Sequence, residues 1–254
     1  MIFYFSATGN SRYVASRIAA ATNDRMISIA DSIKTQTFSF RFHEKEKIGL
    51  VVPTYAWGLP SIVCDFLERL KLEGDKDPYV YFVATYGTTS GQTGYFANEY
   101  MEKKGFPVSA SFSVKMPDTW TPVYDLSDPQ KVDAINRKAE PQIDSMIRKI
   151  QKESPGNNMR DTVPLLFAKL FHSIEYDRMR RTKHFSVEQS CVGCGSCARK
   201  CPVNAIEMQN GVPVWTADQC VMCLGCLHRC PKFAIQYGKR TKKHGQYQNP
   251  HGKG

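Results

Sequence analysis

The sequence lacks any long apolar stretch. None of its runs approaches the roughly 18 consecutive apolar residues that a membrane-spanning helix needs, and 23% of its 254 residues are charged. The opening residues, MIFYFSATGN, have neither the basic region nor the small-residue cleavage site of a secretory signal. With 42% hydrophobic residues, the composition is typical of a globular protein. We therefore expect no membrane span and a cytoplasmic location.

An excess of acidic residues is also missing, because 34 basic residues outnumber 24 acidic ones and the formal net charge is +10. Residues 238–254 contain five basic residues and no acidic one, so this basic tail supplies half of the net charge. It has no apolar periodicity, and we expect its end to be flexible. Such a tail supports only salt-sensitive, nonspecific contact with nucleic acid. A redox-responsive nucleic-acid-binding protein is therefore the weakest functional hypothesis, and we expect no specific nucleic-acid partner.

Two common nucleotide-binding fingerprints are absent near the N-terminus. Neither G-x4-G-K-[ST] nor G-x-G-x-x-G follows the first apolar run, residues 2–5. The loop there is SATGNS, residues 6–11, which supplies three hydroxyls, an unhindered glycine backbone and the start of a helix. Amides at a helix N-terminus bind anions, so this loop predicts a monophosphate site. An ordinary strand-to-helix turn is the alternative.

Strand-like and helix-like runs alternate over the first 150 residues. The runs that we predict as strands are residues 2–5, 26–30, 48–53, 79–85 and 109–116. Helical runs follow the first, third and fourth of these, and a polar helix follows the fifth, over about residues 129–152. This alternation is typical of a parallel sheet with crossover helices. The turn-rich segment SPGNN, residues 154–158, predicts the end of this first domain.

Aromatic residues and glycines occur after the third, fourth and fifth predicted strands, in the loops 53–60, 85–94 and 116–120. The carboxyl ends of parallel strands form the ligand-binding edge of open α/β sheets. Aromatic rings there suit stacking on a planar ligand such as an isoalloxazine, and glycines let backbone amides approach its polar edge. The residues concerned are Tyr55, Trp57, Tyr86, Gly58, Gly87 and Gly91. Isolated hydrophobic plugs are the alternative.

With this phosphate loop and these aromatic loops, residues 1 to about 150 resemble the flavodoxin family. The resemblance implies an α/β fold with a doubly wound parallel five-stranded sheet in the order 2-1-3-4-5, and FMN as cofactor. The implied FMN-binding residues are Ser6, Thr8, Gly9, Asn10, Ser11, Thr54, Tyr55, Ala56, Trp57, Gly58, Thr85, Tyr86, Gly87 and Gly91. Free flavodoxins are typically acidic, whereas this segment is mildly basic, so we expect its partners to differ.

Nine cysteines are present, and eight of them lie between Cys191 and Cys230. In a cytosolic chain the default interpretation is metal binding rather than disulfides. The spacing C-x2-C-x2-C-x3-C-P occurs twice, at an offset of 29 residues, and it is the pattern of two 4Fe-4S clusters that exchange their fourth ligand. The predicted ligands are Cys191, Cys194, Cys197 and Cys230 for cluster one, and Cys220, Cys223, Cys226 and Cys201 for cluster two. Two zinc sites are the alternative, and Cys64 is predicted to be a buried core thiol.

Residues 186–237 strongly resemble bacterial two-cluster ferredoxins, since all eight ligand positions match without a gap. The resemblance implies a small α+β domain that transfers single electrons at low potential. The order of the two parts resembles flavodoxin-ferredoxin fusion proteins of anaerobic microbes over nearly the full chain. We expect a flavodoxin-like FMN-binding domain over 1–153, a helical connector over 154–185, the ferredoxin domain over 186–237 and the basic tail over 238–254.

Within the connector, apolar residues recur at helical spacing on one face. They are Val163, Leu166, Phe167, Leu170, Phe171 and Ile174. We predict that this face docks one domain onto the other and fixes the geometry between the cofactors. A membrane-surface helix or a partner-binding helix is the alternative.

Together these features predict an electron-transfer flavoprotein, in which two 4Fe-4S clusters and FMN exchange electrons and one-electron and two-electron chemistry are interconverted. The alternative is an FMN-dependent reductase of a quinone, a free flavin or an unsaturated organic substrate. No Ser-His-Asp, paired-carboxylate or catalytic zinc arrangement stands out, so the sequence names no catalytic residue. The expected partner is a redox protein or a small-molecule electron acceptor.

Overall fold

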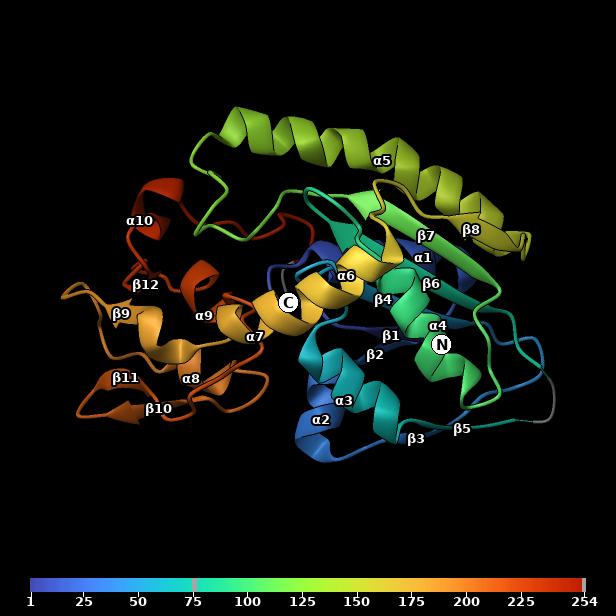
Figure 1. The fold of residues 1–254 in the computed structure, drawn as a ribbon, viewed down its shortest axis with the longest axis horizontal. Coiled ribbons are helices and arrows are strands. Elements are labelled where there is room, and N and C mark those ends of the chain that lie inside the picture. Colours follow the sequence, from blue (N-terminus) through green and yellow to red (C-terminus); the bar gives the residue numbers. More distant parts are fainter. Residues whose placement is uncertain (75–76, 253–254) are drawn as a thin grey trace.

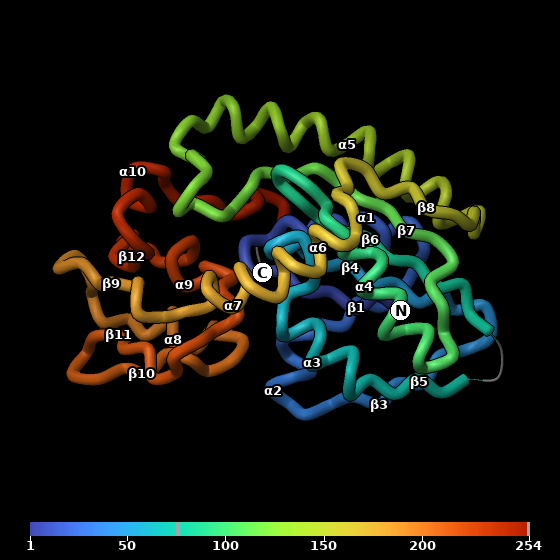
Figure 2. Tube along the Cα trace, in the orientation of Figure 1, coloured from blue at the N-terminus to red at the C-terminus, as the bar shows by residue number. Residues whose placement is uncertain are grey.

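The computed structural model describes residues 1–74 and 77–252. A six-stranded sheet flanked by helices forms the larger part, and a smaller part from the last third of the chain lies beside it (Figures 1 and 2). Among the residues described, none of the helices combines the length and the apolar character that a membrane span requires.

All strands of the main sheet run parallel. In spatial order they are β2 (Met26–Ser28), β1 (Ile2–Tyr4), β4 (Ile48–Pro53), β6 (Val80–Tyr86), β7 (Ala110–Lys115) and β8 (Gly156–Asn158). The first five are the predicted strands in the predicted order 2-1-3-4-5, so the flavodoxin-like sheet is confirmed. The predicted count of five is wrong, because β8 pairs with β7 as a sixth strand. The segment SPGNN therefore extends the sheet past residue 153 instead of ending it.

Helices cover both faces of this sheet (Figure 1). One face carries α1 (Asn10–Thr22) and α5 (Pro129–Gln151), and the other carries α3 (Ser61–Arg69) and α4 (Thr93–Glu102). Successive strand residues point to opposite faces, and accordingly Ile2 packs in the core under α1 while Phe3 packs in the core under α3. The sheet is buried on both sides, which explains why its central strands are almost wholly apolar.

The sequence pattern does not predict three short elements, α2 (Ile29–Thr35), β3 (Ser39–Arg41) and β5 (Lys71–Glu73). Strands β3 and β5 pair with each other in parallel, apart from the main sheet. The predicted strand over 26–30 ends at Ser28, because the Ser28 hydroxyl accepts a hydrogen bond from the Asp31 amide (3.2 Å) and caps α2.

The smaller part is an α+β unit with an internal repeat, as predicted. Strands β10 (Ile206–Gln209) and β11 (Val212–Trp215) form an antiparallel hairpin, and β9 (Phe185–Val187) pairs with β12 (Ile235–Tyr237). The helices α8 (Ser196–Arg199) and α9 (Gly225–His228) are separated by the same 29 residues as the cysteine motifs. The repeat extends to hydrogen bonds, since the Ala205 and Ala234 amides donate to the sulfurs of Cys201 and Cys230, both at 3.3 Å.

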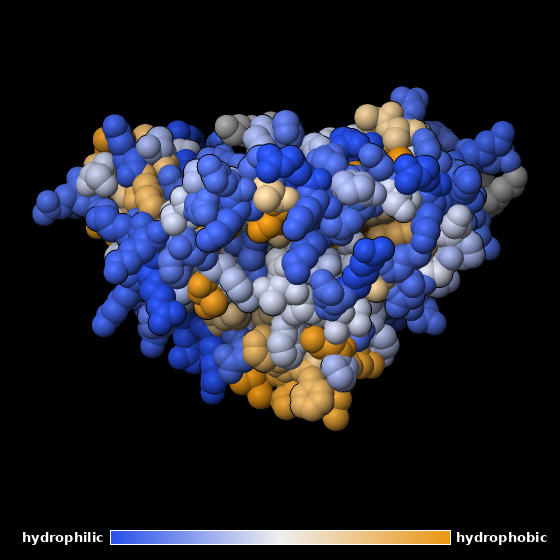
Figure 3. Space-filling view, turned by 90° about the horizontal axis from the view of Figure 1, so that it is seen from above, coloured by the Kyte–Doolittle hydropathy of each residue, from blue (hydrophilic) through white to orange (hydrophobic). Residues whose placement is uncertain are grey.

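The connector is a continuous helical stretch of α6 (Leu165–Phe171), a π-helical turn (His172–Tyr176) and α7 (Asp177–Met179), followed by a 3-10 turn (Thr182–His184). The predicted docking face is wrong, because Leu166 is 78% exposed and Phe167 is 63% exposed. Figure 3 shows hydrophobic residues gathered on a projection of the surface, on the side where α6 lies in Figure 1. The stripe that turns inward is Ala168, Phe171, His172 and Tyr176, whose rings stack and form hydrogen bonds.

The basic tail is packed as far as the structure describes it. It contains α10 (Thr241–His244), and Thr241, Tyr247 and Asn249 are all buried. The expectation of a flexible end is therefore wrong up to residue 252, because polar side chains anchor a segment that has no apolar pattern. Residues 253–254 lie outside the described part.

Candidate functional site

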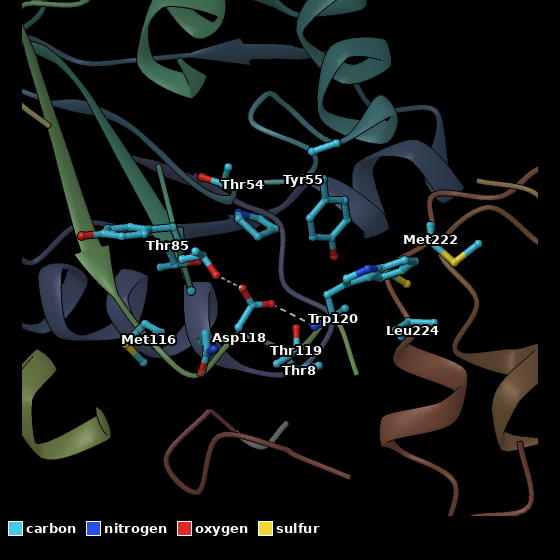
Figure 4. A pocket seen from close by; sticks show the side chains of 18 of the residues that line it. Thr8, Thr54, Tyr55, Thr85, Met116, Asp118, Thr119, Trp120, Met222 and Leu224 are labelled. Carbon is cyan, nitrogen blue, oxygen red and sulfur yellow. Dashed lines mark hydrogen bonds between the residues drawn. The ribbon is translucent and has the colours of Figure 1, made fainter. Parts of the chain in front are cut away.

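A cavity opens at the carboxyl ends of β1, β4, β6 and β7. Of the fourteen predicted FMN-binding residues, all but Gly9, Gly58 and Gly91 line it. In Figure 4, Tyr55 and Trp120 lie on the side of the cavity that faces Met222 and Leu224. The three predicted loops thus meet at one edge of the sheet.

The phosphate loop leaves the start of α1 free of side-chain caps. Gly9 is the residue at the N-cap, with φ of +98°, and no side chain caps the helix. The Gly9 amide donates to the Ser6 hydroxyl (3.1 Å), and the Ser11 hydroxyl bonds to that of Thr85 (2.7 Å). The Thr8 side chain lines the cavity beside them. An uncapped first turn with hydroxyls close by fits a monophosphate anion.

The loop after β4 forms a tight turn, in which Tyr55 and Gly58 exchange two backbone hydrogen bonds of 2.9 Å. Its central residues, Ala56 and Trp57, have φ angles of 45° and 67°, a conformation that costs a non-glycine residue of order 1–3 kcal/mol. The Trp57 ring stacks on Phe171 of α6, with centroids 4.0 Å apart. The connector therefore holds a ring that we expected to be free to stack on a ligand.

The predicted glycines of these loops allow close packing. A Cβ at Gly58 would lie 2.5 Å from the His172 ring nitrogen Nδ1, and one at Gly91 would overlap the Trp57 backbone. A Cβ at Gly87 would overlap Asp118. Gly58 and Gly91 thus lie behind the cavity wall, where they let the connector and the neighbouring loop approach.

Asp118 is a cavity residue to which the sequence assigns no role, although its loop 116–120 is one of the three predicted. Its carboxylate accepts hydrogen bonds from the Trp120 amide and the Thr88 hydroxyl, both at 3.0 Å (Figure 4). Burial raises the pKa of Asp118 above the usual range of a carboxyl. Asp118 contributes a carboxylate to the lining of the cavity, so its ionisation changes the charge of the cavity wall.

One wall of the cavity comes from the cysteine-rich domain. Met222, Cys223 and Leu224 line it, next to Tyr176 of the connector. The buried Tyr176 hydroxyl accepts a hydrogen bond from the Ser61 amide and donates one to the Val221 carbonyl, both at 3.0 Å. These partners lie 115 and 45 positions away in the chain, which is why no local sequence pattern indicates this wall.

Two further cavities lie within the cysteine-rich domain. Cys191, Cys194, Cys197 and Cys230 line the first, and Cys201, Cys220, Cys223 and Cys226 line the second. The structure therefore brings together the same two sets of four that the spacing predicts, with the fourth cysteines exchanged. Among the described residues, no three Cys, His, Asp or Glu side chains converge closely enough for one metal ion. The exchange of the fourth cysteines between the two cavities is the ligand arrangement of two neighbouring 4Fe-4S clusters.

The two cysteine cavities differ in their access to solvent. Cys194 is exposed, beside Val192, which is 61% exposed. Cys223 lines both the second cysteine cavity and the large cavity at the sheet. Cys197 packs in the same apolar clusters as Cys220 and Cys226, so the cysteine cavities are neighbours. The three sites therefore follow one another as first cysteine cavity, second cysteine cavity and sheet cavity, with the exposed Cys194 in the first.

The thiols of the second cavity are held in an apolar environment. Burial raises the pKa of Cys220 to about 12, and it also raises the pKa of Cys223 and of Cys226. Metal binding must therefore displace protons that these thiols otherwise retain. The Met222 amide donates to the Cys220 sulfur (3.2 Å), and hydrogen bonds of this kind tune the potential of iron-sulfur sites.

Comparison with known proteins agrees with this division of the chain. A family model described as a flavodoxin domain matches residues 1–146, and one described as a 4Fe-4S dicluster domain matches residues 190–235. Ferredoxin-1 of Rhodospirillum rubrum is 47% identical over 34 residues, which are 13% of this chain and 62% of that ferredoxin. The chain thus spans less than two thirds of the length of that relative.

Solved structures with a similar arrangement include an azoreductase from Bacillus anthracis, which matches with a TM-score of 0.36 and 10% identity over 59% of this chain and 98% of the azoreductase. The Megasphaera elsdenii flavodoxin matches with a TM-score of 0.31 and 19% identity over 46% of this chain and 89% of the flavodoxin. Rubredoxin:oxygen oxidoreductase of Desulfovibrio gigas matches with a TM-score of 0.35 and 15% identity over 60% of this chain and 36% of that enzyme. Likenesses of this size leave the function open.

Proposed function

This chain belongs to the flavodoxin domain family and carries a 4Fe-4S dicluster domain, and from this we propose that it passes electrons between two 4Fe-4S clusters and FMN. When bound, the clusters accept single electrons and FMN accepts one or two. The chain itself supplies the binding sites and holds them next to one another. Its partner is a redox protein or a small-molecule electron acceptor.

The observation that carries this proposal is the double position of Cys223, on the wall of the second cysteine cavity and on that of the sheet cavity. Cluster two then lies against FMN, with Cys201, Cys220 and Cys226 as its other ligands. Cluster one uses Cys191, Cys194, Cys197 and Cys230, and its exposed Cys194 faces solvent. We infer that electrons are exchanged with an external partner at cluster one.

FMN occupies the sheet cavity in this proposal. Its phosphate binds at the uncapped start of α1, next to Ser6, Thr8 and Ser11. The loops 54–58 and 85–91 hold its ring, between Tyr55 and the wall that includes Met222 and Cys223. The polar phosphate end and the apolar end toward the cysteines thus match the two ends of FMN.

The metal content tests the cluster assignment. Protein purified without oxygen should contain about eight irons and about eight labile sulfides per chain, because each of two cubes contains four of each. Colorimetric iron and sulfide assays on weighed protein measure this directly. Stoichiometric zinc without sulfide would contradict the assignment and favour the zinc alternative.

Asp118 provides a pH-dependent test of the FMN site. At pH values at which Asp118 is ionised, Asp118→Asn removes a negative charge from the cavity wall, so FMN should become easier to reduce. Because burial raises the pKa of Asp118, the difference in potential between variant and wild type should grow as the pH rises through that pKa and disappear below it. Spectroelectrochemical titration measures both potentials. The exposed Asp125→Asn is the control, and a difference independent of pH would contradict the role of Asp118.

A second candidate function is an FMN-dependent reductase of a small acceptor such as a quinone, a free flavin or an unsaturated organic substrate. The observation that favours it is the open mouth of the sheet cavity, which gives a small acceptor access to the loops that hold the ring. Anaerobic reduction of the protein followed by mixing with such acceptors separates the two functions. Turnover of a small acceptor at the FMN, faster than transfer to a redox protein, would favour the reductase.

A further inference from the structure

The C-terminal strap, residues 246–252, joins the cysteine-rich domain to the phosphate loop. In the cysteine-rich domain the strap contacts the end of α9, whose last carbonyls have no partner within the helix. The Gln246 side-chain amide donates to the carbonyls of Leu227 (2.7 Å) and Cys230 (2.9 Å), and that of Gln248 donates to the His228 carbonyl (3.2 Å). The strap therefore caps the helix that precedes Cys230.

His228 belongs to the same junction. The Tyr247 amide donates to its Nδ1 (3.2 Å), so the ring proton is on Nε2, which donates to the Thr119 carbonyl (2.9 Å). His228 is buried, and burial lowers its pKa to about 4. A neutral imidazole thus links α9, the strap and the loop 116–120 of the sheet domain.

In the sheet domain the strap holds the phosphate loop. The Asn249 amide donates to the Thr8 carbonyl (2.7 Å), and its side-chain amide donates to Asn10 Oδ1 (3.1 Å). The Tyr247 hydroxyl donates to the same oxygen (2.8 Å). Asn10 in turn donates to the Pro117 carbonyl (3.2 Å), so its side chain is bonded both to the strap and to the loop 116–120.

The strap acts from behind the loop. Thr8 and Asn10 line the sheet cavity, whereas no residue of the strap does so among those described. Asn249 is only 1% exposed, and a Cβ at Gly252 would overlap the Gly9 carbonyl, which shows how closely the two backbones approach. The strap therefore fixes the conformation of the loop without providing a ligand to what the loop binds.

We propose that Tyr247 and Asn249 are positioning residues for the FMN phosphate, and that the strap links phosphate binding to the docking of the cysteine-rich domain. This inference rests on the proposed function, because it requires FMN in the sheet cavity. One segment bonds to both Asn10 and the end of α9, so ordering of the loop by the phosphate favours the docked position of α9, and docking favours phosphate binding to the same extent.

The test compares FMN with riboflavin, which has the same ring and ribityl chain but no phosphate. Flavin-depleted Asn249→Ala protein should bind FMN about 10- to 100-fold more weakly than the wild type by anaerobic fluorescence titration. Its affinity for riboflavin should change less than about twofold, because Asn249 contacts the phosphate loop and the bonds of Gln246, Tyr247 and Gln248 to the end of α9 remain. Lys243→Ala, on the exposed side of α10, removes a tail charge outside the strap and should bind both flavins normally.

Equal weakening of FMN and riboflavin, or no weakening of either, would overturn the inference, and weakening by Lys243→Ala would assign the effect to tail charge. A wild type that binds neither flavin would instead contradict the proposed function itself. Hydrogen exchange provides a second measurement that a purely structural role would not alter. FMN should slow the exchange of amides 225–230 in the wild type but not in Asn249→Ala, whereas equal slowing in both would refute the link.

Discussion

Replacement of Gly9 by valine is expected to lower the affinity for FMN by about 10- to 100-fold. Gly9 has φ of +98° at the start of α1, where a β-branched residue is strained by about 1–3 kcal/mol, and 1.4 kcal/mol is a factor of ten in affinity. A Cβ there would also lie 3.0 Å from the Asn249 Cβ, so valine displaces the strap as well. Titration of flavin-depleted protein with FMN measures the loss, and iron content should not change.

Gly105 offers a matched control for this variant. Its φ is +82°, and a Cβ there would meet nothing within 4 Å. Gly105→Val therefore carries a similar backbone strain at a site beyond the end of α4, far from the phosphate loop in the sequence. It should lower the stability of the protein and leave FMN affinity unchanged. Equal loss of FMN in both variants would mean that general destabilisation, rather than the phosphate loop, explains the result for Gly9.

Local sequence patterns were sufficient to predict the sheet and the grouping of the cysteines. The strands β1, β4 and β6 are buried on both faces, so their residues form apolar runs that are visible without any tertiary information. The cysteine spacing is equally local, because one short loop holds three of the four thiols of each cavity. In contrast, β8 contains Gly156, Asn157 and Asn158, whose residue types are typical of turns, and only its pairing with β7 makes it a strand.

The parts of the site that the sequence does not predict depend on contacts between distant segments. Tyr176 bridges Ser61 and Val221, and Asn249 bonds to Asn10 across 239 positions. The connector is a second example in which the sequence pattern does not predict the packing. Its apolar periodicity marks one stripe, but ring stacking of Phe171 on Trp57 turns a different stripe inward. Periodicity reports hydrophobicity and does not report hydrogen bonds or ring geometry.

Removal of Cys201 is expected to interrupt electron transfer from the iron-sulfur domain to the flavin. Cys201 lines the second cysteine cavity, the one that shares Cys223 with the sheet cavity. Cys201→Ala should lower the iron content from about eight to about four per chain. Reduction of FMN by an external protein donor, such as a reduced low-potential ferredoxin, should then slow at least about tenfold, because the group between the first cavity and FMN is missing. Stopped-flow absorbance at the flavin band measures the rate.

Cys230→Ala, which affects the other cluster, and Cys64→Ala, which affects neither, are the comparison variants for Cys201→Ala. Cys230 is the fourth cysteine of the second motif but lines the first cavity. Its removal should therefore also leave about four irons, with cluster two still bound and still exchanging electrons with FMN. Cys64 lies in α3, outside both cysteine cavities, and its removal should leave about eight irons. Electron paramagnetic resonance of the reduced variants distinguishes which cluster survives. If Cys230→Ala retained cluster one and lost cluster two, the predicted exchange of fourth ligands would be wrong. If FMN were reduced as fast in Cys201→Ala as in the wild type, electrons would reach FMN directly rather than through the wall that contains Cys223.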